Sequence, residues 1–464
     1  METEIQEEND FGTKPIGGLL AKYSIPCVIS LLINALYNIV DQIFIGRGVG
    51  YLGNGATNIV FPLTIIAAAF GMMIGDGAAA WLSLKLGEGR REEAEKGVGN
   101  AIVMAFGVAV VFLVICLLFL KPLLYLFGCT DIIYPYAFDY GKIIIIGLPF
   151  MLLSTVTGSM IRADGSPKYA MLTVLAGCAI NVVLDAVFIF PLQMGVEGAA
   201  IATVLGLFVS AVLGLRYLPH FKSIKLTRES FKLQLKTCGK VCVLGVSSFI
   251  NQGTTVVVSA LVNNLMRKYG AASAYGAEIP ITAMGIVMKV NSILVAFLIG
   301  IASGSQPIVG YNYGAKKYTR VKKTYQWAAI AAIVIAVIGL AVFQLKPMWL
   351  ISIFGSESDL YNQFAIKCFR IFLLCCVPMA FHTVTCIFLQ AIGRPIKSAL
   401  LSLSRQIILF IPLALILPCF IGIDGVLWAA AWGDGLSFLI AVALCALEIK
   451  KMNVDEAERP LVSL

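Results

Sequence analysis

Charged residues are scarce in this chain of 464 residues. Asp, Glu, Lys and Arg together make up only 13% of it, and there are only two histidines. A soluble protein of this length carries roughly a quarter charged residues, so the scarcity excludes an ordinary soluble domain. Long apolar runs such as 143–161 and 329–345 recur, and a helix that spans a bilayer needs about 20 apolar residues. The sequence therefore predicts an all-α polytopic membrane protein.

Motifs of enzymes and metal centres are also absent. The chain contains no GxSxG or HExxH motif, and its twelve cysteines form no CxxC pair. Most of these cysteines lie inside apolar runs, where Cys behaves as a small hydrophobic residue, so we expect no disulfide framework and no metal cluster. Two histidines leave little for acid–base catalysis. We therefore predict no enzyme activity and no cofactor. The acidic start, METEIQEENDFGTKP, does not resemble a signal peptide, which opens with positive charge.

Apolar runs separated by Gly, Pro and charged residues predict twelve spans. Their expected bounds are 20–46, 57–83, 98–120, 143–161, 169–190, 198–215, 241–266, 279–309, 325–345, 368–391, 398–420 and 425–447.

The two halves of the chain repeat one another. Three pairs of segments are similar at a spacing of 227 or 228 residues: 85–94 with 312–321, 192–202 with 419–429, and 165–167 with 393–395. Such internal similarity predicts two six-helix units in tandem. Because six is an even number, both units enter the membrane from the same side, and the repeats are parallel.

Basic residues predict the orientation. Of the 35 Lys and Arg residues, about 25 fall in the termini and even-numbered loops and about 7 in the odd-numbered loops, and loops rich in Lys and Arg stay in the cytoplasm. The net charge of +9 follows this pattern, so we expect no nucleic-acid partner. Both termini are predicted to be cytoplasmic. The expected parts are a tail (1–19), a first lobe (20–215), a linker (216–240), a second lobe (241–447) and a tail (448–464).

Four segments resemble the multidrug and toxic compound extrusion (MATE) transporters. They are YNIVDQIFIGRG (37–48), KLGEGRREEA (85–94), RADGSPK (162–168) and GSQPIVGYNYGAKKYTRVKK (304–323). The resemblance covers essentially the whole chain. It implies a V-shaped bundle of two lobes around a cavity in the cell membrane. It further implies a cation-coupled antiporter that uses Na⁺ or H⁺ to export drugs and other hydrophobic or cationic compounds by alternating access. We expect a monomer that contacts its small-molecule substrates and the lipid bilayer.

Polar residues inside predicted spans indicate an ion site near the outer surface. Asn181 and Asp185 lie one helical turn apart, and Asp41 and Thr203 fall at a similar depth, about 7–9 Å below the expected helix ends. Their oxygen atoms suit Na⁺, and two close carboxylates can instead share a proton. A simpler interpretation is that Asp185 only bonds Asn181 between helices. In MATE transporters, an Asp of helix 1, an Asn and an Asp of helix 5 and a Thr of helix 6 form the cation site, which the resemblance places here.

The second half lacks these residues. At the spacing of 227, the positions of Asn181, Asp185 and Thr203 are taken by Ile408, Pro412 and Ala430. The predicted ion site therefore belongs to the first lobe alone.

Other polar residues of the spans are candidates for the substrate cavity or for gating. They are Asn34, Tyr37, Asp76, Lys289, His382 and Arg405. For Arg405, an ion pair with Asp434 in the next span is the simpler interpretation. The main alternative function is a flippase for a lipid-linked precursor, whose cavity should carry several Arg or Lys for phosphate. Only Lys289, Arg370 and Arg405 are available for this role, since Lys22 lies at the very start of the first span.

Overall fold

The computed structural model describes residues 10–276, 278–354 and 358–457, and regular structure in these ranges is helical. The α-helices are α1 (Asp10–Thr13), α2 (Ile16–Gly48), α3 (Tyr51–Gly87), α4 (Arg91–Leu118), α5 (Leu120–Leu126), α6 (Tyr134–Ala163), α7 (Pro167–Ile189), α8 (Gly195–Arg216), α9 (Leu235–Ala271), α10 (Glu278–Gly314), α11 (Tyr318–Leu345), α12 (Pro347–Phe354), α13 (Asp359–Phe372), α14 (Cys376–Ala391), α15 (Pro395–Leu403), α16 (Ile411–Ile421) and α17 (Asp424–Ala457). Two short 3₁₀ turns, η1 (Leu218–His220) and η2 (Arg228–Phe231), and one π-helix, η3 (Ser404–Phe410), complete them.

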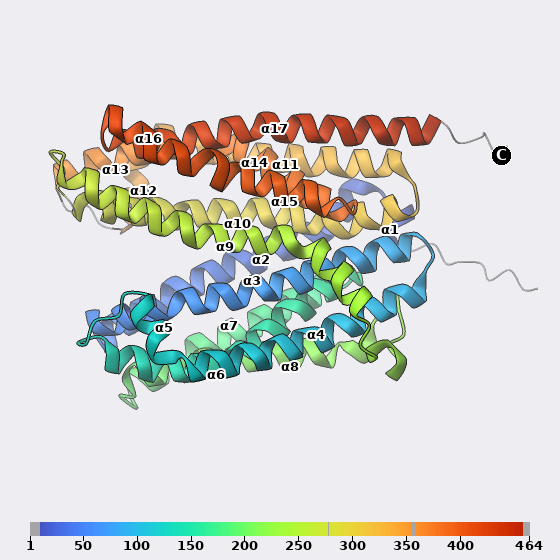
Figure 1. The fold of residues 1–464 in the computed structure, drawn as a ribbon, viewed down its shortest axis with the longest axis horizontal. Coiled ribbons are helices and arrows are strands. Elements are labelled where there is room, and N and C mark those ends of the chain that lie inside the picture. Colours follow the sequence, from blue (N-terminus) through green and yellow to red (C-terminus); the bar gives the residue numbers. More distant parts are fainter. Residues whose placement is uncertain (1–9, 277, 355–357, 458–464) are drawn as a thin grey trace, which may run out of the picture. The chain divides into compact units, whose positions relative to one another are not determined.

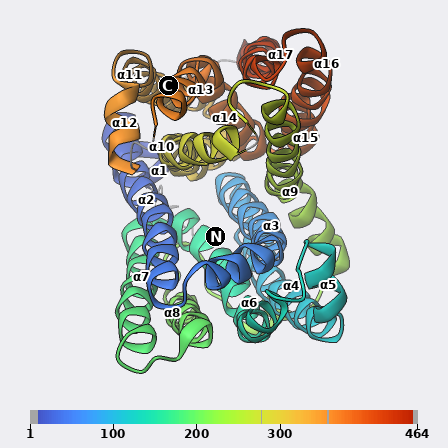
Figure 2. The same ribbon diagram turned by 90° about the vertical axis from the view of Figure 1, so that its left-hand side faces the viewer.

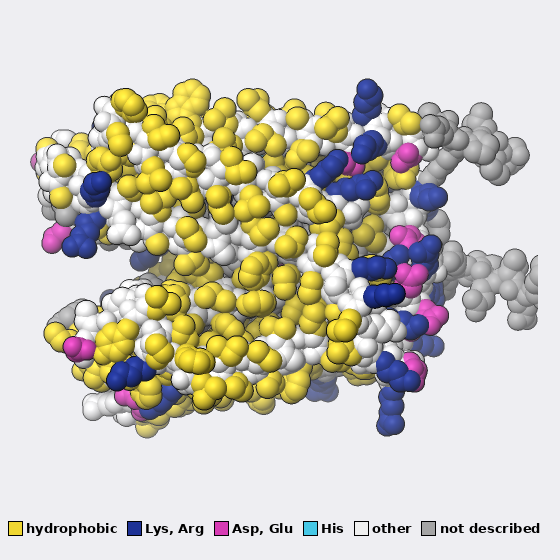
Figure 3. All heavy atoms as spheres, in the orientation of Figure 1, with side chains coloured by type: hydrophobic (Ala, Val, Ile, Leu, Met, Phe, Trp, Pro, Cys, Tyr) yellow, Lys and Arg dark blue, Asp and Glu magenta, His cyan; other side chains and the backbone are white. Residues whose placement is uncertain are grey.

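The predicted membrane spans are present. In the described part of the chain, 11 helical segments are long and apolar enough to cross a bilayer, and a twelfth candidate is the pair α13 and α14, bent by 47°. Each predicted span falls on one of them. The chain is therefore an all-α, multi-pass membrane protein. Hydrophobic side chains cover the lengths of the helices, while charged side chains gather toward the helix ends (Figure 3).

The chain forms two compact units. One comprises the described residues of Met1–Ser24 and Thr254–Leu464, and the other comprises Ile25–Gly253. Within each unit the long helices run side by side (Figure 1), and their cross-sections are clear when the helices are viewed end-on (Figure 2). The helices that pass from one unit to the other are α2 and α9. These are the first long helices of the two repeats, so the halves of the chain match in this respect too.

Two irregular helices in the second repeat have a common cause. Proline has no N–H to bond the carbonyl four residues earlier, and its ring crowds that carbonyl. Pro378 stands four residues after Leu374, which lies in the break between α13 and α14. Pro412 stands four residues after Ile408, which lies inside the π-helix η3. Both distortions therefore fall on the turn that loses a hydrogen bond.

The segment between α8 and α9 is folded against the Ile25–Gly253 unit. Asp164, directly after α6, accepts a hydrogen bond from the Tyr217 hydroxyl at 2.8 Å. The backbone amides of Lys222 and Ser223 also donate to Asp164, at 2.8 and 2.9 Å. Burial raises the pKa of the Asp164 carboxyl group, and these donors oppose the shift. At the end of the segment, the backbone amide of Gln234 donates a hydrogen bond to the side-chain oxygen of Asn100 of α4, at 2.6 Å.

Candidate functional site

Four side chains predicted from the sequence meet in the Ile25–Gly253 unit. Asp185 and Asn181 lie one turn apart on α7 and are 0% and 2% exposed. Asp41 of α2 is half-buried, as is Thr203 of α8. Measured from the helix ends in the structure, Asp185, Asp41 and Thr203 lie about 6, 10 and 12 Å along their helices. The depths differ from the expected ones because α2 and α8 extend further than predicted.

Small residues bring α7 and α8 together. A Cβ atom added to Gly177 would lie 2.7 Å from the Gly206 carbonyl oxygen, and one added to Gly206 would lie 2.6 Å from that of Gly177. This close approach lets the side chains beside the glycines meet. The Asn181 amide donates a hydrogen bond to the Thr203 hydroxyl at 3.2 Å, which orients the Asn181 carbonyl oxygen toward the other side.

A third glycine brings α2 against α7. A Cβ atom at Gly48, the last residue of α2, would lie 2.1 Å from the side chain of Ile189 at the end of α7. One to two turns before this contact, the carboxyl groups of Asp41 and Asp185 lie within hydrogen-bonding reach of each other. Two carboxylates repel each other at this range, so the pair requires a proton or a cation between its oxygens.

The oxygens of this cluster lack protein donors. Both carboxylate oxygens of Asp185, Oδ1 of Asp41 and Oδ1 of Asn181 are buried, and no donor among the described residues stands in hydrogen-bond geometry to them. Buried acceptors are normally paired because leaving one unpaired costs about 1–3 kcal/mol. Four such acceptors in one place are a candidate ligand set for a cation. The donors are hard oxygens and fit Na⁺, and the acid pair equally fits a proton.

Tyrosines line the acid pair. Tyr37, one turn before Asp41 on α2, interacts electrostatically with Asp41 and Asp185. Tyr140 of α6 is buried and interacts with the same two acids. Sequence reasoning missed Tyr140 because it lies ninety-nine positions from Asp41 and carries no spacing signal. Both phenols therefore lie close enough to the acid pair to interact with its charge.

The remaining candidates of this unit lie outside the cluster. Asn34 is exposed, and its side-chain oxygen accepts from the Asn38 amide at 3.3 Å. Asp76 of α3 accepts hydrogen bonds from Ser159 of α6 at 3.0 Å and Ser248 of α9 at 2.8 Å. Asp76 therefore joins three helices through its carboxylate, in an arrangement that suits a gating role.

Three candidates lie in the other unit. Lys289 of α10 is exposed. His382 of α14 is 4% exposed, with Nε2 3.1 Å from the Leu401 carbonyl oxygen, so it ties α14 to α15. The expected ion pair of Arg405 and Asp434 is present, with Nη1 and Oδ1 3.4 Å apart. In the described part of the chain, no group of three His, Cys, Asp or Glu side chains has the arrangement of a metal site.

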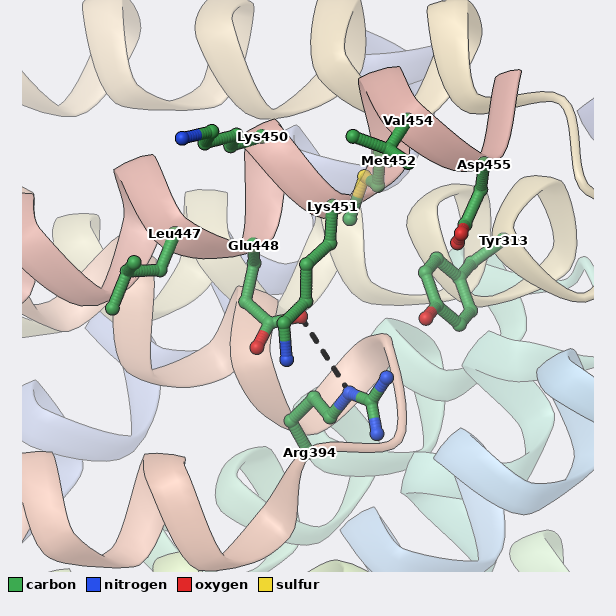
Figure 4. A pocket seen from close by; sticks show the side chains of 9 residues that line it. All are labelled: Tyr313, Arg394, Leu447, Glu448, Lys450, Lys451, Met452, Val454 and Asp455. Atoms are coloured by element: carbon green, nitrogen blue, oxygen red, sulfur yellow. Dashed lines mark ion pairs between the residues drawn. The ribbon is translucent and has the colours of Figure 1, made fainter. Parts of the chain in front are cut away.

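A surface pocket of about 400 Å³ lies near the end of α17 (Figure 4). Its lining carries both signs of charge. Glu448 is almost fully buried and pairs with Arg394 at 3.5 Å and with Lys397. The most buried charge of the pocket is thus neutralised by the protein itself, so the pocket is a weaker candidate than the acid cluster.

Comparisons with known proteins place the chain in one family. The MatE family model matches residues 26–187 and 246–416. Multidrug export protein MepA of Staphylococcus haemolyticus (strain JCSC1435) is 23% identical over 446 residues, covering 94% of each chain. An FAD transporter of Shewanella oneidensis is 23% identical over 427 residues, covering 89% of this chain and 91% of its own.

Solved structures share the fold. One, described as the outward-facing conformation of a multidrug resistance MATE family transporter of the MOP superfamily, superposes with a TM-score of 0.89 at 20% identity. It covers 97% of this chain and 99% of its own. A crystal structure of MATE in complex with MaL6 also has a TM-score of 0.89 at 20% identity, over 96% and 98% of the two chains.

Proposed function

The chain belongs to the MATE family of membrane transporters, and from this premise we propose that it is an antiporter that exchanges Na⁺ or H⁺ for organic compounds. Transport of small molecules, not catalysis, is the activity of the family. Beyond transport, we propose a coupling ion, the residues that bind it and an alternation between two access states.

The observation that carries the proposal is the set of buried oxygens without donors. Asp185, Asp41 and Asn181 each bury at least one such oxygen in the same unit. A carboxylate in a membrane is costly and is retained mainly where it binds an ion or proton. One cation between the two acids removes the repulsion and supplies the missing partner. Thr203 holds Asn181 in the orientation that this requires.

Exchange follows if the ion and the substrate favour different states. When each ligand stabilises its own conformation, binding of one lowers the affinity for the other by the same factor. We assign the two states to movement of the lobes 20–215 and 241–447. The cation site lies in the first lobe alone, because Ile408, Pro412 and Ala430 replace its residues in the second.

Drugs and other hydrophobic or cationic compounds are the proposed substrates. Relatives at 21–23% identity are named multidrug export proteins, in keeping with this class. Another relative is named an FAD transporter, so the substrates of this chain need not all be cations. A flippase for a lipid-linked precursor requires several cationic side chains at one place. The structure pairs Arg405 with Asp434 and leaves Lys289 on a separate helix, which does not favour it.

We further propose a monomer in the cell membrane with both termini in the cytoplasm. This orientation follows the excess of Lys and Arg in the termini and even-numbered loops.

Transport in liposomes tests the proposal. The full-length protein is reconstituted in liposomes that are loaded with ethidium. Export of ethidium is followed under an imposed Na⁺ gradient and, separately, under an imposed proton gradient. We expect one of the two gradients to drive export and to be consumed by it, as measured by ²²Na⁺ flux or internal pH. The absence of both ethidium movement and ion movement under either gradient would contradict the coupling.

A further inference from the structure

An arginine lies in the middle of a membrane-spanning segment of the second repeat. Arg405 is on the π-helix η3, ten residues from the start of the segment Pro395–Ile421. Its partner in the described part of the chain is Asp434 of α17, at 3.4 Å, and the two side chains are 22% and 18% exposed. The pair is therefore only partly buried.

The guanidinium group has spare hydrogen-bonding capacity. It carries five N–H donors, and in the described part of the chain only the single bond to Asp434 engages it. That bond is also long, because charge-assisted N–H···O bonds are normally about 2.7–2.9 Å and Arg prefers to bind a carboxylate through two of them. Asp434 thus contacts Arg405 through one nitrogen and leaves its other donors unused.

Part of the Arg405 side chain, 22%, is not covered by the protein. Charged side chains inside membrane segments almost always face the bundle interior or a water-filled cavity, since lipid tails do not solvate them.

The repeat shows that this arrangement is specific to the second half. Pro412 occupies the position that corresponds to Asp185, and it accompanies a π-helix where the first repeat has the regular helix α7. π-helical turns inside α-helices are frequent at functional sites. At the spacing of 227, Arg405 corresponds to Cys178 and Asp434 to Leu207, so the first repeat has no counterpart of this ion pair.

We propose that Arg405 binds the negatively charged group of a transported compound, such as a carboxylate, sulfonate or phosphate. The inference rests on the proposed transport function and extends it to substrates that carry an anionic group. Two oxygens of that group replace the single long bond to Asp434 with a two-point contact, and Asp434 holds the guanidinium in place when no substrate is bound. Arg405 is thus a residue that determines substrate specificity.

Two dyes that differ in one charge test this assignment. Rhodamine 110 carries a free carboxylate, and rhodamine 123 is its methyl ester. Binding of each to the purified full-length protein in a neutral detergent is measured by fluorescence anisotropy, without any ion gradient. We expect Arg405→Gln to weaken rhodamine 110 binding about tenfold or more, the loss typical of a charge-assisted bond. Its rhodamine 123 binding should stay within about twofold, because the ester offers no charge.

Matched variants complete the test. Asp434→Asn removes the competitor for Arg405 and should tighten rhodamine 110 binding but not rhodamine 123 binding. Arg370→Gln removes an exposed arginine of the same unit and should change neither. Retained rhodamine 123 binding shows that each variant is folded.

Several results would overturn the proposal. They are absence of rhodamine 110 binding to the unmodified protein, an equal change for both dyes in Arg405→Gln, and no change for either. Displacement by added phosphatidylglycerol without any preference for rhodamine 110 would assign the site to lipid phosphate and also overturn it. Because no gradient is present, failure of ion-driven export would contradict the coupling and leave this result intact.

Discussion

At the scale of single residues, the proposed ion site uses neutral groups as well as charged ones. Asn181 has its amide nitrogen bonded to Thr203, so its carbonyl oxygen is available for a cation beside Asp185. Loss of the Thr203 hydroxyl removes no charge from the site. It frees the Asn181 side chain to rotate, which affects how tightly the ion is held rather than whether the exchange can occur.

Thr203→Ala should therefore weaken ion binding while preserving transport. We expect the ion concentration for half-maximal transport to rise about fivefold, which corresponds to roughly 1 kcal/mol for one neutral hydrogen bond. The maximal rate should change less. The measurement is export against ion concentration in liposomes, with Thr64→Ala of the same unit as a control, since Thr64 bonds only its own helix. A loss of maximal rate at unchanged ion affinity would contradict this role.

The sequence predicts the four polar residues of the cluster, but not the tyrosine of α6 that lies beside them. The four-residue spacing of Asn181 and Asp185 and the depths of Asp41 and Thr203 were sufficient to expect one cluster. Tyr140 was not predicted, because a tyrosine in an apolar run has no pattern that distinguishes a site residue from packing. Its position is fixed by contacts between α6 and the other helices of the unit, which a single sequence does not encode locally.

At the scale of elements, prolines explain where the second repeat departs from regular helices. Pro378 and Pro412 each follow a distorted turn by the four residues that a missing hydrogen bond requires. The prolines are visible in the sequence, but the form of each distortion is not. One becomes a bend of 47° and the other a π-helix, because the packing of neighbouring helices decides how the chain accommodates the lost bond.

The pair of Arg405 and Asp434 joins the π-helix to α17, and its removal tests this link. Arg405→Gln or Asp434→Asn alone leaves one charge without its partner and should lower the free energy of unfolding by about 3 kcal/mol. Changing both should cost clearly less. Thermal unfolding in detergent measures all three variants. Equal losses in the single and double variants would show that the pair does not stabilise the fold.

The segment between α8 and α9 is a second element that the sequence predicted only as a basic linker. Asp164 gathers the backbone amides of this segment, so Asp164→Ala leaves several donors unpaired, each at a cost of about 1–3 kcal/mol. We expect trypsin to cleave at Lys222 or Lys225 several times faster in this variant. Asp131→Ala, which removes an acid that accepts from Tyr125, is the control. Unchanged cleavage would contradict a docked segment.

At the scale of the whole molecule, the spans and the repeat were predictable. Apolar runs mark the spans along the full chain, and similar segments at a fixed spacing mark the repeat. The division into compact units was not, since the helices α2 and α9 each contribute to both units. Helix packing sets that boundary, whereas apolar runs show only where helices lie.

Orientation is tested by labelling from one side of the membrane. Cysteines placed at Arg91 and Lys317 should react with an impermeant maleimide only from the cytoplasmic side, and one at Glu197 only from outside. The Cys419→Ser chain serves as background, because Cys419 is exposed. Labelling of Arg91 and Lys317 positions from opposite sides would contradict parallel repeats.

The most direct test of ion coupling is gradient-driven export by the charge-neutral variants of the acid pair. Asp185→Asn and Asp41→Asn keep the size of each side chain but cannot ionise, so each should abolish export in liposomes while the protein remains folded and inserted. Asp139→Asn, an exposed acid of the same unit paired with Lys142, should transport normally. We expect export to be lost in Asp185→Asn and Asp41→Asn only. Unmodified, gradient-driven export by both Asp185→Asn and Asp41→Asn would show that the pair is packing and not the coupling site.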